Sequence, residues 1–356
     1  MNRKKTKKTQ KLKYVITIPS VDIRNYIAIN DLILLGSSDN RYQELKERNP
    51  VLKQYLDSFR TPFRREVNPS IIVRDESLEK VEPSHLCAFR NAIAISSVIG
   101  SRILSHNQTN TGFYCTDLFD FYPVSVSSDG TDLKARTAFE DSSCCDVNNF
   151  SGQTTPSVIY PENIRPAIDD KLMLALLDVI EKKARTLEEK RFKNRVTRTM
   201  EMVFYALRSP FVVLGEPTDF GVQMSLWVSA FETLANPHST HVKFCDVSDI
   251  IKAVPWRDKK LRIRNHASPT RQGEKTSLPV QIYGRLWRTR NAYIHGNVMR
   301  KGEYEFHKRK GWGNLFFQVP ALYRGVLMRI LNLKGFGLPV QSTQEHDLFE
   351  KILLSK

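Results

Sequence analysis

Residues 171–208 form an uninterrupted run without proline or glycine, and the run is dense in Leu, Ala, Glu, Lys and Arg. Each of these residue types has a high propensity for helix. Apolar residues recur along the run as an intermittent stripe, which is the pattern of an amphipathic helix. The run is therefore predicted to form one long helix or two, and it commits the C-terminal half of the chain to helical structure.

Further segments of the same half show helical patterns, with Pro210 and Asn236-Pro237 as breaks between them. These segments are 217–235, 247–254, 278–298 and 315–333. Residues 257–276 are rich in Lys and Arg and lack an apolar stripe, so they are predicted to be a mobile basic loop. Four or five helices joined by loops are typical of a helical bundle, predicted here over residues 165–356.

Residues 14–160 mix short apolar runs with turn residues and are predicted to form an α+β sensing or regulatory domain. The expected elements are a strand at 14–18, a helix at 84–104, a hairpin of 119–127 with 133–139, and a loop over 140–157. The predicted fold class is thus an α+β N-terminal region followed by an all-α bundle, mostly α overall.

The positive charge of the chain is unevenly distributed. The 356 residues contain 54 Lys plus Arg and 38 Asp plus Glu, a net charge of +16. Residues 1–13 carry +7 and are expected to be a disordered tail, residues 181–356 carry +15, and residues 14–180 carry −6. This asymmetry favours a polyanion such as nucleic acid as partner of the C-terminal half, although a solubilising surface gives the same count.

Several classes of protein are disfavoured by missing motifs. The sequence has no P-loop, no dinucleotide fingerprint, no Cys-x-x-Cys, no His-Glu-x-x-His and no Gly-x-Ser-x-Gly. Five scattered cysteines suit a reducing compartment, and no apolar run reaches the roughly 18–20 residues that span a bilayer. We expect a cytoplasmic protein without signal peptide or membrane helix.

A metal site is weakly suggested by His238, His241 and Cys245, which offer zinc ligands within eight residues. No fourth ligand is identifiable. Loop histidines beside an ordinary cysteine are the preferred interpretation, so neither a metal nor a cofactor is expected.

The stretch most informative about chemistry is 283–296, YGRLWRTRNAYIHG, which holds Arg290, Asn291 and His295. Histidine can transfer a proton near neutral pH, and the arginine fork stabilises charge developing on a phosphate. RNA supplies its own 2′-hydroxyl nucleophile, so cleavage with these groups needs no metal. A second basic run, Lys308-Arg309-Lys310, follows.

Helix geometry limits how these residues cooperate. Asn291 and His295 are four apart and share a helical face, whereas Arg290 and His295 are five apart and differ by about 140°. Arg290 and His295 can meet at one phosphate if the long side chain bends round, if the helix is irregular near Gly296, or if two copies meet across a symmetric interface. We favour the third arrangement.

The motif Arg290-Asn291-x3-His295-Gly296, together with the upstream segment LWVSAFETLANP at 226–237, resembles the HEPN superfamily of metal-independent ribonucleases. The wider sequence around the motif, LWRTRNAYIHGN, looks most like the Apea-like HEPN branch found in abortive-infection proteins. The resemblance covers residues 165–356 and leaves 1–160 without an assigned role.

The resemblance implies a helical bundle that dimerises with two motifs facing each other and cleaves RNA to a 2′,3′-cyclic phosphate. It implies that Arg290 stabilises the phosphate, that His295 is the general acid or base, and that Asn291 orients substrate or partner. Glu232 corresponds to an acidic helix position that would orient Arg290. By the same analogy the setting is antiviral defence or a toxin, acting on tRNA or mRNA, with a phage or cellular trigger recognised by the N-terminal region.

Two other functions remain open on the sequence. A non-catalytic RNA-binding or scaffold module would rely on its basic residues, which include Lys259, Lys260, Arg262, Arg264 and Arg288. A DNA-binding regulator would prefer a duplex of defined sequence. The bland interpretation of the motif is that His295 only caps a helix before Gly296.

Overall fold

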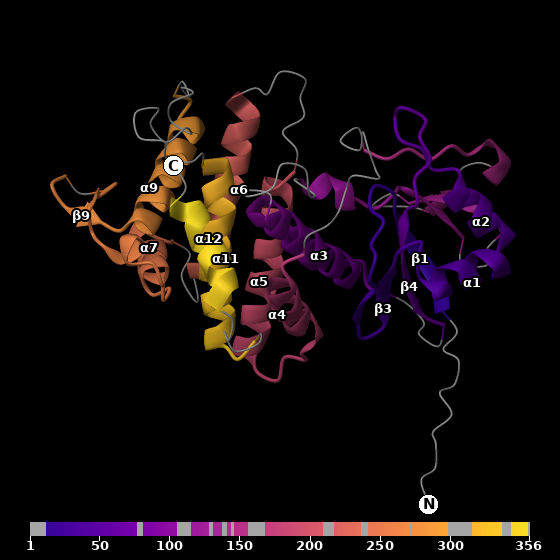
Figure 1. The fold of residues 1–356 in the computed structure, drawn as a ribbon, viewed down its shortest axis with the longest axis horizontal. Helices are drawn as coiled ribbons and strands as arrows, with labels where there is room; N and C mark the ends of the chain where they lie inside the picture. The colour runs from indigo at the N-terminus through magenta and orange to yellow at the C-terminus, as the bar shows by residue number, and fades with distance from the viewer. Residues whose placement is uncertain are drawn as a thin grey trace, which may run out of the picture. The chain divides into compact units, whose positions relative to one another are not determined.

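The computed structural model divides into two units (Figure 1). It describes residues 12–76, 81–104, 115–127, 131–136, 141–143, 146–155, 168–208, 217–235, 241–270, 272–297, 315–336 and 343–354. The first unit comprises residues 1–87 and 117–164, and the second comprises residues 88–116 and 165–356. The chain is mostly helical, with antiparallel sheet in its N-terminal part, as the sequence predicted.

The first unit is built on antiparallel strands. A four-stranded sheet has the order β1-β4-β3-β2, and a three-stranded sheet has the order β5-β6-β7. The strands are β1 (Leu12–Ile18), β2 (Ile27–Ile29), β3 (Leu32–Leu35), β4 (Ser70–Asp75), β5 (Val124–Val126), β6 (Leu133–Arg136) and β7 (Asp141–Ser143). The predicted hairpin is the β5–β6 pair, and the predicted strand at 14–18 is β1.

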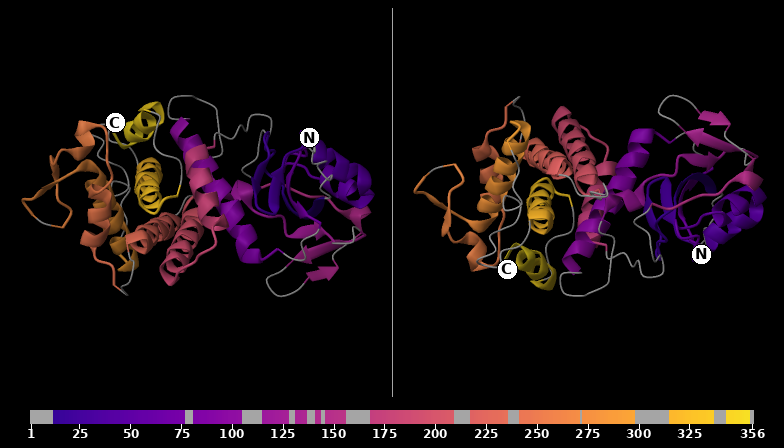
Figure 2. Two further views of the ribbon diagram at one scale, coloured as in Figure 1. Left: turned by 90° about the horizontal axis from the view of Figure 1, so that it is seen from below. Right: turned by 90° about the horizontal axis from the view of Figure 1, so that it is seen from above.

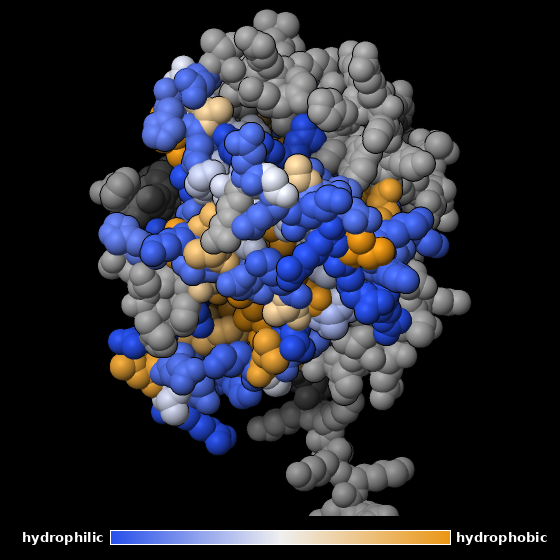
Figure 3. Space-filling model, turned by 90° about the vertical axis from the view of Figure 1, so that its left-hand side faces the viewer, coloured by the Kyte–Doolittle hydropathy of each residue, from blue (hydrophilic) through white to orange (hydrophobic). Residues whose placement is uncertain are grey.

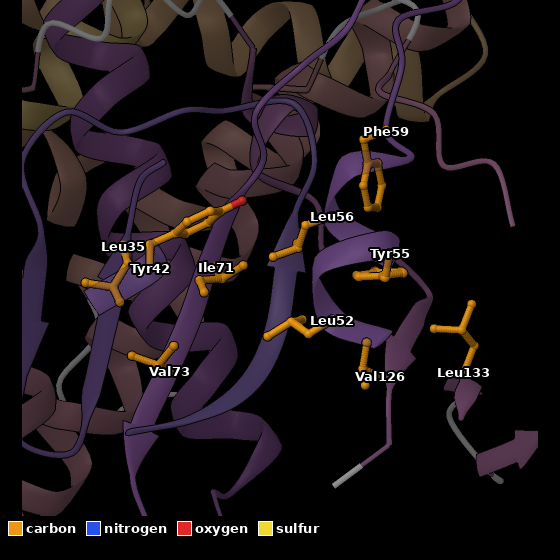
Figure 4. Packing of buried hydrophobic residues seen from close by; sticks show 10 residues of the cluster. All are labelled: Leu35, Tyr42, Leu52, Tyr55, Leu56, Phe59, Ile71, Val73, Val126 and Leu133. Carbon is orange, nitrogen blue, oxygen red and sulfur yellow. The ribbon is translucent and has the colours of Figure 1, made fainter. Parts of the chain in front are cut away.

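Helices α1 (Asn40–Arg48) and α2 (Pro50–Asp57) close the core of the first unit. Asp39 and Asn49 cap their N-termini by accepting backbone N–H groups. Figure 4 shows the side chains that meet between these helices and the two sheets. They are Leu35, Tyr42, Leu52, Tyr55, Leu56, Phe59, Ile71, Val73, Val126 and Leu133.

Three predictions for the N-terminal part need correction. Leu12 and Lys13, expected in the tail, belong to β1, while residues 1–11 lie outside the described part. The expected loop 140–157 contains β7 and a short 3-10 helix, Val147–Asn149. Helix α3 (Pro83–Leu104), expected in the N-terminal domain, belongs from residue 88 onward to the second unit.

The affiliation of α3 follows from its apolar character. Residues 92–99 are all buried, so the helix has no solvent side along this stretch. Its Arg90 guanidinium lies 4.1 Å from the ring centroid of Phe204, and the Ser96 carbonyl accepts the Asp169 N–H at 3.1 Å. Figure 2 shows α3, in purple, beside the pink helices that follow it in the second unit.

The second unit is formed almost entirely by helices. They are α3, α4 (Asp170–Glu181), α5 (Leu187–Ala206), α6 (Pro217–Ala235), α7 (Phe244–Lys252), α8 (Lys259–Arg262), α9 (Leu278–Ile294), α11 (Leu315–Leu333) and α12 (Thr343–Leu354). The run 171–208 is two helices, because the Thr186 and Glu189 side chains form a capping box that starts α5. The bounds of α6 and α11 match the sequence prediction.

The predicted basic loop 257–276 is not a loop throughout. It contains α8 and a small hairpin of β8 (His266–Ala267) with β9 (Lys275–Thr276). Leu261 is fully buried, and the buried Glu350 carboxylate accepts the backbone N–H groups of Arg257 and Asp258, both at 2.6 Å. The segment is therefore anchored by α12, and the unit is not strictly all-α.

Helices α6 and α9 pack side by side and antiparallel. The rings of Phe231 and Tyr283 are 5.3 Å apart near one end of the pair. Near the other end, a Cβ on Gly221 would lie 2.1 Å from Cδ2 of Tyr293, so only glycine fits there. The opposed residue order fixes which side chains of the two helices can meet. Among the helices that the structure describes, none is long and apolar enough to cross a membrane.

Candidate functional site

The candidate site centres on an ion pair between α6 and α9. The Nη2 of Arg290 donates to Oε1 of Glu232 at 2.6 Å, and the two side chains are 21% and 26% exposed. The residues are 58 positions apart, and the antiparallel packing of α6 on α9 brings them together. The two segments that carry the resemblance therefore meet at this contact.

Most of the hydrogen-bond donors of the Arg290 side chain are not used by the contact with Glu232. A guanidinium has five N–H donors, and among the described residues Glu232 is the one hydrogen-bond partner of this side chain. None of its other nitrogens is among the buried side-chain atoms that lack a hydrogen-bond partner. The pair thus holds the guanidinium in place while leaving donors for an anion.

Glu232 sits in a partly apolar environment. Burial raises the pKa of its carboxyl above 4.5, and the neighbouring Arg290 charge opposes this shift. The fully buried Tyr283 hydroxyl is close enough to feel both charges, and burial raises its pKa well above the usual range. Tyr283 also stacks on Phe244, with ring centroids 5.4 Å apart. These rings form the apolar wall behind the ion pair.

His295 is the cap residue just after the last turn of α9, which ends at Ile294 rather than at the predicted residue 298. Gly296 has φ +69°, and the Asn297 N–H returns to the Ala292 carbonyl at 2.9 Å. This is the common glycine-terminated helix end, which explains the shorter helix. The His295 side chain is exposed and can meet a ligand or a second chain.

The Arg290 side chain is directed away from the end of α9 that carries His295. Glu232 follows Phe231, which packs on Tyr283 near the N-terminal part of α9. To reach Glu232, the Arg290 side chain runs back toward that part of the helix, the usual direction for long helical side chains. His295 lies at the opposite, C-terminal end. While it is bound to Glu232, the Arg290 guanidinium therefore lies away from His295 along the helix.

Asn291 lies between the two groups on α9 and is partly buried. Its backbone carbonyl accepts the His295 N–H at 3.0 Å. Its side chain makes no hydrogen bond to any described residue. Among the described residues, the amide therefore has no partner that an incoming group would have to displace.

The basic residues expected to contact RNA are on neighbouring elements. Lys259, Lys260, Arg262 and Arg264 belong to α8 and its C-terminal end, all are exposed, and α8 packs against α9. Arg288 is exposed on α9 itself. Figure 3 shows that the face with α7, α9 and β9 is predominantly hydrophilic with scattered apolar patches. Lys308, Arg309 and Lys310 lie outside the described residues.

Two of the three residues of the weak zinc candidate, His241 and Cys245, are among the described residues. His238 lies outside the described residues, His241 is exposed just before α7, and Cys245 is exposed within the first turn of α7 rather than in a loop. Among described residues, no group of three or more His, Cys, Asp or Glu side chains could hold a metal ion.

Glu350 is a residue of this region that sequence reasoning missed. It fixes the start of the basic helix α8 from 92 positions away, and no local pattern announces such a contact. Comparison of the chain with family models, curated proteins and solved structures finds no match.

Proposed function

We propose that the second unit is a metal-independent endoribonuclease of HEPN type, with Arg290 and His295 as its catalytic pair. The single observation that carries the proposal is the Arg290–Glu232 contact at 2.6 Å. It links the helix bearing the Arg-Asn-x3-His motif to the helix bearing the Phe-Glu-x-Leu segment, which are the two parts of the resemblance.

The chemistry follows from the groups present. The Arg290 guanidinium, anchored by Glu232, would stabilise the charge that develops on the scissile phosphate. The exposed His295 imidazole would take the 2′-hydroxyl proton or give a proton to the leaving oxygen. Attack of the 2′-oxygen on phosphorus then releases the 5′-oxygen and leaves a cyclic phosphate. Asn291 would orient the RNA.

The direction of the Arg290 side chain away from His295 supports a site shared by two copies. In a symmetric pair with α9 facing α9, His295 of one copy can approach the phosphate bound by Arg290 of the other. Basic residues on α8 would extend the RNA contact. The proposed setting, antiviral defence or a toxin acting in the cytoplasm, rests on the family resemblance alone.

The proposal is tested by incubating the full chain and its His295→Ala variant with total tRNA and a synthetic RNA in excess EDTA. The expected result is cleavage with 2′,3′-cyclic ends, reduced at least about 100-fold in the variant. His241→Ala, which removes an exposed histidine beside α7, is the matched control and should cleave normally. Wild-type cleavage by His295→Ala would refute the assignment, and a DNA of the same sequence should stay intact.

The second candidate function is a non-catalytic RNA-binding or scaffold module. It is favoured by the direction of the Arg290 side chain away from His295. A chain that does not form a pair through α9 would then lack a complete catalytic site. RNA binding that weakens steeply with salt, without product, would support it. Analytical ultracentrifugation of the same samples would show whether a pair forms.

A further inference from the structure

The first unit exposes two aromatic side chains, each next to an arginine. Among its described residues, the exposed large apolar side chains are Tyr26, 56% exposed, and Phe63, 63% exposed. The Arg41 guanidinium lies 4.3 Å from the centroid of the Tyr26 ring, and the exposed Arg64 directly follows Phe63. Single exposed apolar residues are ordinary on a protein surface. Two exposed aromatic rings, each next to an arginine, are typical of a surface on which bases stack.

Strand register places the strands that follow Tyr26 and the Phe63 turn so that both begin at the same end of the four-stranded sheet. Ile27 of β2 pairs with Leu34, and Ile71 of β4 pairs with Leu35. The beginnings of β2 and β4 are therefore both next to the end of β3. Tyr26 immediately precedes β2, and the turn that carries Phe63 leads into β4.

The turn that presents Phe63 is held by hydrogen bonds to Thr61, which is only 2% exposed. The Thr61 Oγ1 accepts the N–H groups of Phe63 and Arg65, both at 3.2 Å, and its carbonyl accepts the Arg64 N–H at 2.9 Å. Arg64 adopts φ +61°, an unfavourable conformation for a residue other than glycine. The fold thus maintains a strained turn that displays a phenylalanine to solvent.

The base of this turn is firmly anchored. The Arg60 N–H donates to the Gly152 carbonyl, the Thr154 N–H donates to the Arg60 carbonyl, and both bonds are 3.0 Å long. A Cβ on Gly152 would lie 2.6 Å from the Phe59 ring, so the two segments are in tight contact. A backbone that is already held in place loses little conformational entropy when a ligand stacks on a side chain of the turn.

The charge at this end of the sheet is positive, although residues 14–180 carry −6 overall. Asp39 pairs with Arg41 and Glu66 pairs with Arg60, whereas Asp22 accepts a hydrogen bond from the neutral Ser37 and keeps its charge. Among the described residues, the exposed Arg24 and Arg64 side chains have no ion-pair partner. The guanidinium groups of Arg24 and Arg64 are therefore available to an anionic ligand.

We propose that this end of the sheet binds single-stranded nucleic acid, with Tyr26 and Phe63 stacking on unpaired bases and Arg24 and Arg64 contacting phosphates. Exposed π-faces next to cations suit unpaired bases, whereas a duplex hides its base faces. An acidic protein would use the arginines but would leave two exposed aromatic rings unexplained. This inference goes beyond the proposed nuclease, because it needs neither Arg290 nor His295.

The test uses the full chain and a fluorescein-labelled 2′-O-methyl oligouridine, which lacks the free 2′-hydroxyl and cannot be cut by attack of that group. Fluorescence anisotropy should give about 5- to 10-fold weaker binding for Phe63→Ala and for Tyr26→Ala, the size expected for a lost stacking contact. Arg64→Gly removes the charge while glycine keeps the positive φ, and about a 3-fold loss is expected. A second oligonucleotide with 5-iodouridine should photo-crosslink to peptides that contain Tyr26 or Phe63.

Arg48→Ala is the control, since Arg48 is also an exposed arginine of the same unit, but it lies on α1 and pairs with Glu44. It should bind like the wild type, and thermal melting should show all variants folded. Unchanged affinity of both aromatic variants would overturn the proposal and leave the surface for a protein partner. Equal losses for a duplex would overturn it too, because they would indicate charge alone. The His295→Ala cleavage assay is independent of these outcomes.

Discussion

Two arginine–carboxylate pairs of the second unit show how burial separates a structural role from a chemical one. Arg324 binds Asp169 through two hydrogen bonds, 2.5 and 3.2 Å long, and the side chains are only 4% and 6% exposed. Arg290 binds Glu232 through one nitrogen, and both side chains reach solvent. The first pair is closed to any ligand, whereas the second keeps donors available.

The surroundings of the buried pair explain its role. Asp169 also caps α4 by accepting the Leu172 N–H, and the Arg324 guanidinium lies 3.4 Å from the centroid of the Phe349 ring. The pair therefore connects the start of α4 with α11 and α12. Removing one partner from such a pair leaves an unpaired buried charge, which is the costly case.

The largest effect is expected for Arg324→Ala, which should lower the free energy of unfolding by about 3–5 kcal/mol. The measurement is urea unfolding followed by circular dichroism. Arg290→Ala is the control, with a loss of at most about 1 kcal/mol because this pair is partly solvated. Comparable losses in the two variants would break the comparison between the pairs.

The next effect concerns activity and rests on the proposed nuclease. Arg290→Ala should reduce RNA cleavage by about 100- to 1000-fold, the usual cost of losing a group that stabilises developing charge. Arg290→Lys keeps the charge but not the fork, so cleavage should be intermediate. Single-turnover rates with saturating RNA would measure this, and equal rates in all three proteins would contradict a catalytic role for Arg290.

The smallest effect is a pH dependence of stability. Since the pKa of Glu232 is raised in the folded chain, the folded state holds this proton more tightly than the unfolded state. The resulting stabilisation is fully present below pH 4.5 and is lost as the pH rises through the raised pKa. Glu232→Gln should flatten this part of the stability curve, measured by urea unfolding at several pH values. Parallel curves would show that burial does not govern this carboxyl.

The helices were largely predictable from the sequence, whereas much of the sheet was not. Strong periodicity gave α6 and α11 their bounds, with Pro217 and Pro237 marking the ends of α6, whereas α11 continues through the internal Pro320. Strands β2 and β3 are three and four residues long, and β3 (Leu32–Leu35) is apolar throughout, so neither shows a diagnostic alternation. Helices α1, α2 and α12 were also missed, because they are only 9, 8 and 12 residues long and their apolar patterns are correspondingly short.

The candidate site was predictable as a set of residues but not as a geometry. The sequence of residues 283–296 pointed to Arg290, Asn291 and His295, and the resemblance to the HEPN superfamily added Glu232. The direction of the Arg290 side chain depends on the antiparallel packing of α6 and α9, which no local pattern encodes. The same holds for Glu350 and α8, where a carboxylate meets backbone N–H groups 92 and 93 positions away.

The path of the chain between the units has a consequence for synthesis on the ribosome. Helix α3 ends at Leu104, but its neighbour α5 is complete only at Ala206, about 100 residues later. At roughly 5–20 residues per second, this apolar helix waits about 5–20 s for its partner. A nascent chain in that interval has this apolar segment without its packing partner, and no single cut of the finished chain releases an intact helical unit.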